Sequence, residues 1–379
     1  MAYFDHNSTT PPFQEVITTM GDTYQSAWSN PSSPHRAGTQ VRARLEQARE
    51  AICEYLSVDP KCLTFTSGAT EANNTVIGWS SEYFDRGSAL ISAIEHPSVL
   101  EACRYRYGNR LQFIPSNVQG EVEVGKVEEL LKSIRPTFVS LLAAHNETGV
   151  IQPWKEVALL CQKYGAWFHC DATQWIGKLE PDGLGICSSF SFSAHKFGGP
   201  KGVGGIFAQE PISWMHGGGQ ERESRGGTEN YPAIQGMKVA FDQSLLSPEF
   251  YKNLEKGRNQ FEEKIKFYLE GVKILGEKAP RLWNTSFLIL PEFDNLSWIA
   301  KLDKMGYQLS TGSACSSARE ESSALAKAVG LRLEEERRLV RASGWLETSE
   351  DDWLKLADAI ELAHKELIID RDNTGVISL

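Results

Sequence analysis

The chain has 379 residues, 41% hydrophobic and 23% charged, a composition typical of a globular protein long enough for two domains. Acidic residues outnumber basic ones by 49 to 39, and the formal net charge of −10 argues against a nucleic-acid-binding surface. No stretch is apolar for long enough to span a bilayer, so no membrane association is expected.

The first residues and the cysteines bear on the compartment. The segment MAYFDHNSTTPP has no basic region followed by an apolar one, so no secretory signal is expected there. The seven cysteines are scattered and lack paired C-x-x-C spacing, which argues against a disulfide framework and against a zinc site. We therefore expect reduced thiols, no bound metal and a cytoplasmic protein.

Taken in chain order, the first half of the sequence alternates between helical and strand-like segments. Residues 36–56 carry apolar side chains at helical spacing, and a short strand at 62–68 precedes a helix at 69–79. Further strand-like runs that end in polar residues occupy 89–96, 137–149, 166–174 and 188–196, with a helix at 97–106 after the first of them. This alternation predicts an α/β fold with a mostly parallel central sheet and helices on both faces.

The second half of the chain is organised differently. A long polar helix is expected within 247–271, and short strands and further helices follow it. These elements predict a smaller α+β domain, formed by residues 1–14 and 256–379, beside a large domain at residues 15–255. The first dozen residues are expected to pack near the smaller domain.

Five polar residues each lie just beyond a separate predicted strand: Thr70, His96, Asn146, Asp171 and Lys196. Because ligands bind at the carboxyl ends of strands in open α/β sheets, we expect these residues to converge on one site. Lys196 stands between a strand and a glycine-rich turn, where partial desolvation lowers the pKa of its amine and favours a nucleophilic role. A solvated surface lysine is the alternative, and the four polar neighbours count against it.

The other residues expected at this site are suited to binding pyridoxal phosphate. Asp171 could pair with a pyridinium nitrogen, and the helix start at Ala69 and Thr70 could hold a phosphate. His96 could stack on a flat ring or move protons near neutral pH, and Asn146 could bond a ring oxygen. Each residue also has an ordinary structural alternative. Thr70 or Asp171 could be a helix cap, His96 could be a buried histidine of the core, and Asn146 could be a turn residue.

Two residues of the C-terminal part stand out chemically. Cys315 lies in STGSACSSA, where small neighbours indicate an accessible loop and a thiol kept for its reactivity. The alternative is a small residue in a turn. Arg341, in LVRASG, could bind a carboxylate through a bidentate pair, or could form a surface ion pair.

A series of motifs in order, including YFDHNSTTPP, TSGATEANN, EHPSVL, NETGVIQP, DATQWIGK, SFSAHKFGGPKG, RGGTEN and STGSACSSA, resembles the cysteine desulfurases of the NifS/IscS type. These enzymes are a branch of the class V aminotransferase family. The resemblance covers most of the chain and implies a fold-type I pyridoxal-phosphate-dependent transferase that forms a homodimer.

By motif position, the resemblance also implies roles for individual residues. Lys196 would form the Schiff base with pyridoxal phosphate, His96 would stack on its ring, and Asp171 would pair with its ring nitrogen. Arg341 would bind the substrate carboxylate, Asn146 and Gln174 would lie near the phenolic oxygen and the substrate, and Cys315 would accept the sulfur. The other cofactor-binding residues would be Ala69, Thr70, Asn146, Gln174, Ser193, His195 and, reaching the phosphate in the partner subunit, Thr228.

The implied reaction converts L-cysteine to L-alanine and leaves the sulfur on Cys315 as a persulfide, for an acceptor protein in iron–sulfur cluster or thio-cofactor biosynthesis. A selenocysteine lyase, or another class V lyase or aminotransferase, is the nearest alternative and would not need Cys315. A non-catalytic sulfur-assembly partner would have lost at least one of Lys196, Asp171, His96 and Cys315, and all four are present. A nicotinamide dehydrogenase would need a glycine fingerprint that this chain lacks.

Overall fold

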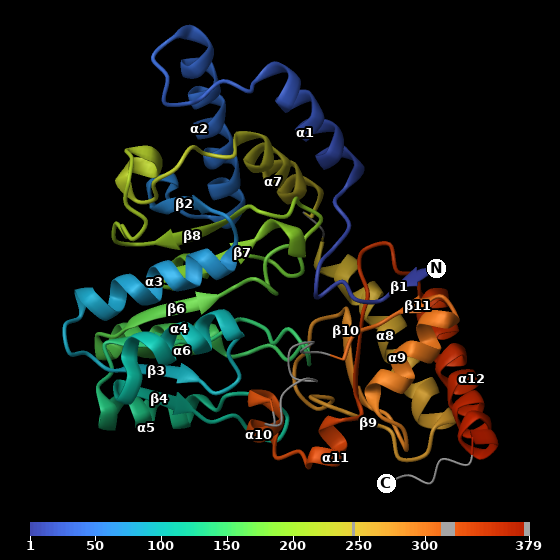
Figure 1. The fold of residues 1–379 in the computed structure, drawn as a ribbon. Helices are drawn as coiled ribbons and strands as arrows, with labels where there is room; N and C mark the ends of the chain where they lie inside the picture. The colour runs from blue at the N-terminus through green and yellow to red at the C-terminus, as the bar shows by residue number, and fades with distance from the viewer. Residues whose placement is uncertain (245–246, 312–322, 375–379) are drawn as a thin grey trace.

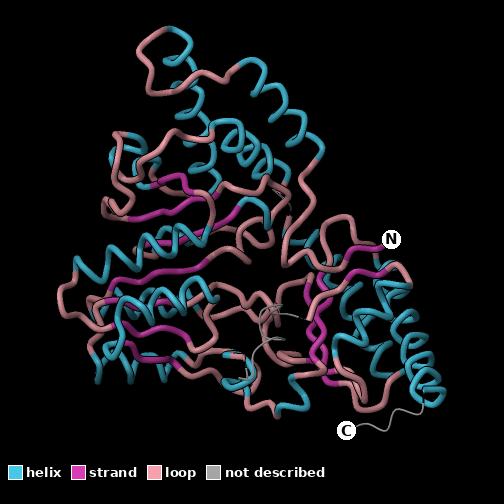
Figure 2. The backbone as a smooth tube through the Cα atoms, viewed as in Figure 1, coloured by secondary structure: helices cyan, strands magenta, loops and turns pink. Residues whose placement is uncertain are grey.

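The computed structural model describes residues 1–244, 247–311 and 323–374, and these form two sheet-based regions side by side (Figures 1 and 2). Within these residues, the larger region is a seven-stranded sheet with the order β2-β8-β7-β6-β5-β3-β4, in which β8 alone runs antiparallel to its neighbours. The mostly parallel α/β sheet predicted from the sequence is therefore confirmed. Its strands are β2 (Leu63–Thr66), β3 (Ala89–Ser92), β4 (Leu111–Ile114), β5 (Phe138–Ser140), β6 (Trp167–Asp171), β7 (Ser189–Ser193) and β8 (Gly204–Ala208).

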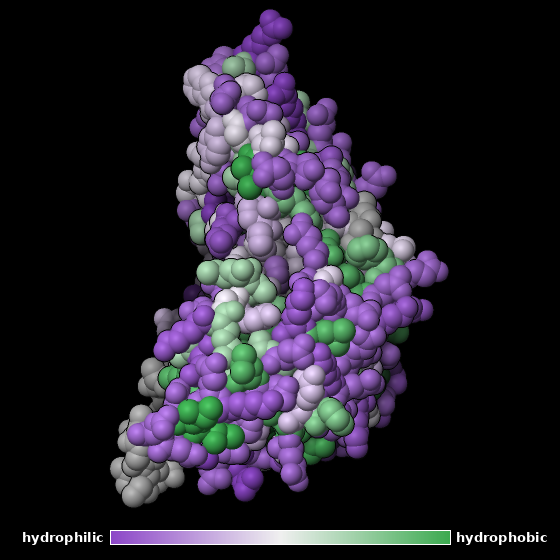
Figure 3. Space-filling view, turned by 90° about the vertical axis from the view of Figure 1, so that its right-hand side faces the viewer, coloured by the Kyte–Doolittle hydropathy of each residue, from purple (hydrophilic) through white to green (hydrophobic). Residues whose placement is uncertain are grey.

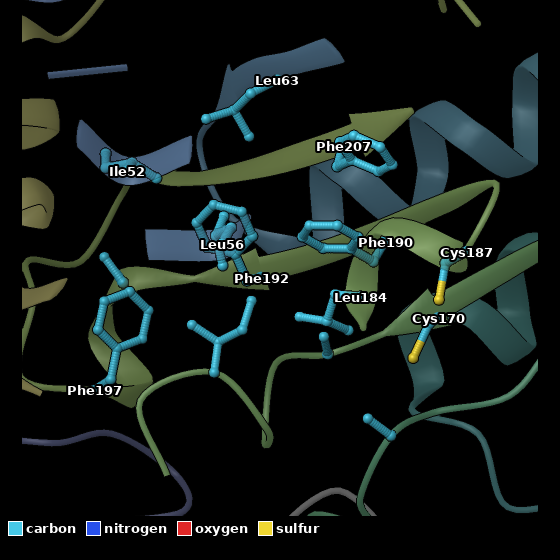
Figure 4. Close-up of a cluster of buried hydrophobic side chains, with 14 of the residues drawn as sticks. Ile52, Leu56, Leu63, Cys170, Leu184, Cys187, Phe190, Phe192, Phe197 and Phe207 are labelled. Atoms are coloured by element: carbon cyan, nitrogen blue, oxygen red, sulfur yellow. The ribbon is translucent and has the colours of Figure 1, made fainter. Parts of the chain in front are cut away.

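Helices cover both faces of this sheet because its strand residues alternate between two apolar cores. Phe207 of β8 faces one core, whereas Ile206 and Ala208 face the other. Figure 4 shows Phe190 and Phe207 in the first core, near Leu56 from the end of α2. The first face carries α2 (Arg36–Leu56), α5 (Val124–Ile134), α6 (Trp154–Tyr164) and α7 (Tyr231–Gln243), on which α1 (Gln14–Ser26) packs; the second carries α3 (Ala69–Tyr83) and α4 (Pro97–Tyr107).

Within the described residues, the smaller region is a three-stranded antiparallel sheet whose longer helices pack on one face. Leu288 and Val340 from this sheet pack against helix residues such as Phe261, Trp298 and Ile360. The domain boundary expected near residue 255 lies inside the first of these helices, and that division stays a prediction. The elements are β9 (Lys273–Ile274), β10 (Thr285–Ile289), β12 (Leu339–Ser343), α8 (Pro248–Tyr268), α9 (Asn295–Lys304), α10 (Ala324–Val329), α11 (Leu333–Glu336) and α12 (Glu350–Thr374).

The N-terminal segment joins the two regions. Strand β1 (Ala2–Tyr3) pairs in parallel with β11 (Tyr307–Gln308) of the smaller region. The chain then crosses to the larger region, where the main-chain N–H of Thr10 donates to the carbonyl oxygen of His195 at 2.9 Å. Residues 5–10 therefore lie directly beside the turn that follows β7.

Three further observations concern the surface, the helices and the side chains that could bind a metal. The face of the molecule in Figure 3 is mostly hydrophilic, with small separate groups of hydrophobic residues. None of the helices in the described part of the chain combines the length and apolarity that a membrane span requires. The same part of the chain contains no cluster of three or more His, Cys, Asp or Glu side chains arranged to hold a metal ion.

Candidate active site

A cavity of about 400 Å³ lies at the carboxyl ends of β6 and β7, where the two regions and the N-terminal segment meet. The residues expected from the sequence line it, apart from Thr228 and Cys315. Thr228 is exposed and lines a separate cavity of about 130 Å³ beside Glu221, and Cys315 lies outside the described residues. The expected residues that line the main cavity are Ala69, Thr70, His96, Asn146, Asp171, Gln174, Ser193, His195, Lys196 and Arg341.

Lys196 reaches the cavity from the turn that follows β7. Its Nζ donates hydrogen bonds to the main-chain oxygens of Asn7 and Ser8, at 2.7 and 2.8 Å. Burial, assisted by the positive charge of Arg341, lowers the pKa of this amine to about 8, although Asp171 acts in the opposite direction. A substantial fraction of the amine is therefore neutral near physiological pH, as a nucleophile requires.

Asp171 is the last residue of β6 and is 5% exposed. Its Oδ2 accepts from Asn73 Nδ2 at 2.8 Å and its Oδ1 accepts from the main-chain N–H of Thr173 at 3.0 Å. Within the described residues no cationic side chain forms an ion pair with this carboxylate. A buried carboxylate that borders a cavity and lacks a counter-ion is suited to a cationic ligand group such as a pyridinium.

His96 caps the N-terminus of α4 and borders the same cavity. Its Nδ1 accepts from the main-chain N–H of Ser98 at 3.1 Å and lies 2.7 Å from the Ser98 hydroxyl. The ring is open to the cavity but otherwise surrounded by protein, and this dehydration lowers its pKa, while Asp171 raises it and Lys196 lowers it further. The imidazole is therefore neutral near pH 7, with its flat face available to a ring.

The start of α3 provides a site for an anion. Gly68, at a φ of +151°, lets the chain turn from β2 into the helix, and a Cβ built there would lie 3.0 Å from Ser193 Oγ. The main-chain N–H of Ala69 donates to that hydroxyl at 2.7 Å. Thr70 and His195 line the same cavity. Helix N-termini with adjacent hydroxyl groups bind phosphate, so these residues fit the phosphate of pyridoxal phosphate.

Arg341 of β12 is 2% exposed and already has several partners. Its Nη2 donates to Asp5 Oδ1 and to Ser8 Oγ, both at 2.6 Å, and its Nη1 donates to the main-chain oxygen of Asn146 at 2.9 Å. The ion pair with Asp5 is buried rather than on the surface. These contacts hold the guanidinium rigidly at the cavity wall, where it can meet a carboxylate.

Asn7, Gln174 and Lys178 form a buried network that sequence reasoning did not identify as a unit. Lys178 is fully buried, and its Nζ donates to Asn7 Oδ1 at 2.8 Å and to Gln174 Oε1. Gln174 Nε2 donates to the Asn7 main-chain oxygen at 3.0 Å, the same atom that accepts from Lys196. Burial lowers the pKa of Lys178 well below that of a free lysine. This network sets the orientation of both Gln174 and the acceptor of Lys196.

Two buried glutamates near the cavity were also missed. Burial raises the pKa of Glu95 to about 8, and its Oε1 accepts from the Ser140 hydroxyl at 2.9 Å. Glu147 lines the cavity, and burial raises its pKa to about 7 even though Arg341 lowers it. The positions of both next to predicted site residues, in EH and NE, were the available signal.

Comparisons of the sequence and the structure with known proteins find similar proteins that match this chain over both regions. The family model described as Aminotransferase class-V matches residues 2–355. A cysteine desulfurase IscS from Dictyoglomus turgidum is 33% identical over 373 residues, covering 95% of this chain and 93% of that protein. A selenocysteine lyase from Xenopus laevis is 34% identical over 395 residues, covering 92% and 91%. A solved structure of a NifS-like protein superimposes with a TM-score of 0.87 at 30% identity, covering 96% and 99%.

Proposed function

The chain belongs to the class-V aminotransferase family, and on this premise we propose that it is a pyridoxal-phosphate-dependent cysteine desulfurase of the NifS/IscS type. The observation that carries the proposal is the convergence of Lys196, Asp171 and His96 on one cavity, with the pKa of the Lys196 amine lowered to about 8. The substrate is L-cysteine, the product is L-alanine, and the sulfur passes to Cys315.

Different residues of the cavity would bind different parts of the cofactor. Lys196 would bind it covalently through Nζ, Asp171 would meet its ring nitrogen, and Ala69, Thr70, Ser193 and His195 would hold its phosphate. When bound, pyridoxal phosphate supplies an electron sink that stabilises negative charge on the substrate carbons.

The chain's own groups would position the substrate and move its protons. Arg341 would bind the α-carboxylate, since its guanidinium is fixed at the cavity wall by Asp5 and Asn146. The Lys196 amine, once released from the cofactor, would take the proton from Cα, because its lowered pKa lets it act as a base near neutral pH.

The sulfur transfer itself belongs to Cys315. Its thiolate would attack the sulfur of L-cysteine, forming an S–S bond while the Cβ–S bond breaks and its electron pair stays with the carbon fragment. Protonation of that fragment at Cβ, and return of a proton to Cα from the Lys196 ammonium, would complete L-alanine, while Cys315 retains a persulfide. An acceptor protein with a free thiol would then remove the persulfide sulfur.

A selenocysteine lyase is the second candidate, favoured by the 34% identity to the Xenopus laevis protein of that name. The two functions differ in their need for a cysteine on the enzyme. A lyase that releases selenium directly would remain active on L-selenocysteine without Cys315. The desulfurase proposal requires Cys315 for turnover of L-cysteine.

The deciding experiment measures alanine and sulfide released from L-cysteine in the presence of a thiol reductant. We expect both products from the parent chain, neither from Cys315→Ala, and normal amounts from Cys62→Ala, which removes a half-buried thiol outside the cavity. Equal alanine from parent and Cys315→Ala, with higher activity on L-selenocysteine, would favour the lyase. A cofactor-loaded parent that makes no alanine from either substrate would refute both.

Three accompanying features belong to the same proposal. We expect a homodimer in which Thr228, exposed and outside the main cavity, reaches the phosphate in the partner subunit. We expect a sulfur-acceptor protein, in iron–sulfur cluster or thio-cofactor biosynthesis. We also expect the cytoplasm as the compartment, because the thiol chemistry requires a reduced Cys315.

A further inference from the structure

Asn73, on α3, lies directly behind the cavity and has no assigned role. It is fully buried and touches residues from three other elements: β6, β7 and α4. Its Nδ2 donates to Asp171 Oδ2 and to Ser98 Oγ, both at 2.8 Å. Its Oδ1 accepts from Ser191 Oγ at 2.5 Å and lies 2.9 Å from His169 Nε2.

These contacts fix the orientation of the Asn73 amide. A carboxylate such as Asp171 only accepts hydrogen bonds, so the NH₂ group must face it, and the carbonyl oxygen must face Ser191 and His169. Both amide hydrogens and both oxygen lone pairs then have partners. A flipped amide would place its oxygen against the Asp171 carboxylate.

The same reasoning fixes the proton on His169. Because Asn73 Oδ1 only accepts, His169 Nε2 must carry a hydrogen, and burial, which lowers the pKa of this ring to about 4, keeps it neutral. Its Nδ1 therefore accepts from the Ser189 hydroxyl at 3.0 Å, and that hydroxyl accepts from Trp167 Nε1 at 2.9 Å. The donors point one way, from Trp167 through Ser189 and His169 to Asn73.

The chain of hydrogen bonds continues from Asn73 to His96, with each donor pointing the same way. The Ser98 hydroxyl accepts from Asn73, so its own hydrogen is directed to His96 Nδ1 at 2.7 Å, beside the main-chain N–H of Ser98. Two donors therefore meet Nδ1, and the neutral His96 ring carries its hydrogen on Nε2. In the described part of the chain, this Nε2 has no hydrogen-bond partner.

We propose that Asn73 is the positioning residue of this site. One N–H of its amide donates to Asp171. The other donates to Ser98, whose hydroxyl in turn holds His96 as a neutral ring with its proton on Nε2. The inference rests on the proposed function, because Asp171 and His96 are the groups expected on the cofactor ring. Asn73 touches neither substrate nor cofactor and acts through these two side chains. His96 can then give a proton at Nε2 but cannot take one there.

The test compares Asn73→Ala with Ser98→Ala and with a matched control, Asn74→Ala. Asn74 is the next residue on α3, is exposed, and donates to the main-chain oxygen of Thr70 in its own helix. The first readout is the dissociation constant of pyridoxal 5′-phosphate, measured by equilibrium dialysis. Loss of a hydrogen bond to a charged group should weaken binding about 10- to 100-fold in Asn73→Ala. Ser98→Ala, which keeps the Asp171 contact, should stay within about threefold of the control.

The second readout is the titration of His96 in ¹⁵N-histidine-labelled apoprotein, assigned by loss of its signal in His96→Gln. Both variants should raise its midpoint: Ser98→Ala removes the hydroxyl that donates to Nδ1, and Asn73→Ala removes the amide that holds this hydroxyl as a donor. The titratable groups around His96 are Asp171, Lys196, His145 and Glu95, whose carboxyl meets the main chain of His96, and all remain in both variants. Asn74→Ala should titrate like the parent.

The outcomes separate this proposal from the proposed function, since neither readout involves L-cysteine. Cofactor affinity of Asn73→Ala within twofold of Asn74→Ala would overturn the Asp171 part. An unchanged His96 midpoint in both Asn73→Ala and Ser98→Ala would overturn the His96 part. If Asn73→Ala does not fold, Asn73→Ser takes its place, because a serine hydroxyl is too short to reach Asp171 and Ser98 together.

Discussion

Replacing Glu95 by glutamine should change how the stability of the protein depends on pH. Glu95 is 4% exposed, and burial raises the pKa of its carboxyl from 4.5 to about 8, with Asp171 acting in the same direction. Hydrogen bonds from Ser140 and from main-chain N–H groups lower it only in part. The folded protein therefore keeps this carboxyl protonated at neutral pH, and glutamine resembles that neutral form.

The raised pKa determines the sign and the size of the effect. Between pH 4.5 and about pH 8, the folded state holds a proton at Glu95 that the unfolded state has released, so the free energy of unfolding falls as pH rises. Each pH unit in this window costs about 1.4 kcal/mol. From pH 5.5 to pH 7.5 the loss due to Glu95 is therefore on the order of 2–3 kcal/mol.

Urea denaturation of the apoprotein across this range measures the effect. The free energy of unfolding of Glu95→Gln relative to the parent should increase steadily with pH and level off above about pH 8. Glu82→Gln, on the exposed part of α3, removes one formal charge without burial and serves as the control. A difference between Glu95→Gln and the parent that is constant from pH 5.5 to 7.5 would refute this reasoning.

The rate at which the apoprotein takes up pyridoxal phosphate can be measured by stopped-flow absorbance. This rate should rise about tenfold per pH unit until the Lys196 amine is mostly neutral near pH 8. A rate that does not change with pH would contradict the lowered pKa of Lys196. Arg341→Gln should move that midpoint upward, because the charge of Arg341 lowers the pKa of Lys196. Arg341→Lys should raise KM for L-cysteine about tenfold or more with a smaller effect on kcat, since an ammonium cannot form the bidentate contact; equal losses in both would argue against a role in binding. Arg49→Ala leaves Glu221 buried without its partner at 2.8 Å and should lower the free energy of unfolding, measured with urea, by about 3–5 kcal/mol. Lys163→Ala removes an exposed ion pair and should change this free energy little. Similar losses in the two variants would contradict the expected effect of burial.

Local patterns in the sequence were sufficient to predict the large sheet and most of the site. Helical spacing predicted residues 36–56 as a helix, and α2 spans Arg36–Leu56. Polar residues at the ends of apolar runs predicted that Asp171 and Lys196 would meet, because parallel strands bring their carboxyl ends to one edge.

The rest of the site depends on contacts between distant segments, which no local pattern encodes. Asn7 was assigned to a segment near the smaller region, yet its main-chain oxygen accepts from Lys196, far along the chain. Asn73 occupies an ordinary helical position, and only the packing of α3 against β6 and β7 places it behind Asp171. The sequence also carries no sign that Arg341 has Asp5 as a partner, because that pair joins the segment after β1 to β12, 336 positions later.

The crossing of the N-terminal segment has a consequence for the order in which the protein is made. The main-chain N–H of Asn7 donates to Ser343 Oγ, a residue 336 positions later in the sequence. At about 5–20 residues per second, a ribosome needs roughly 15–70 s to produce that partner. Until then the nascent chain lacks the fixed acceptor of Lys196, so we expect the site to be completed only near the end of synthesis. A fusion placed ahead of Ala2 would have to leave that strand free to join Tyr307 once it emerges.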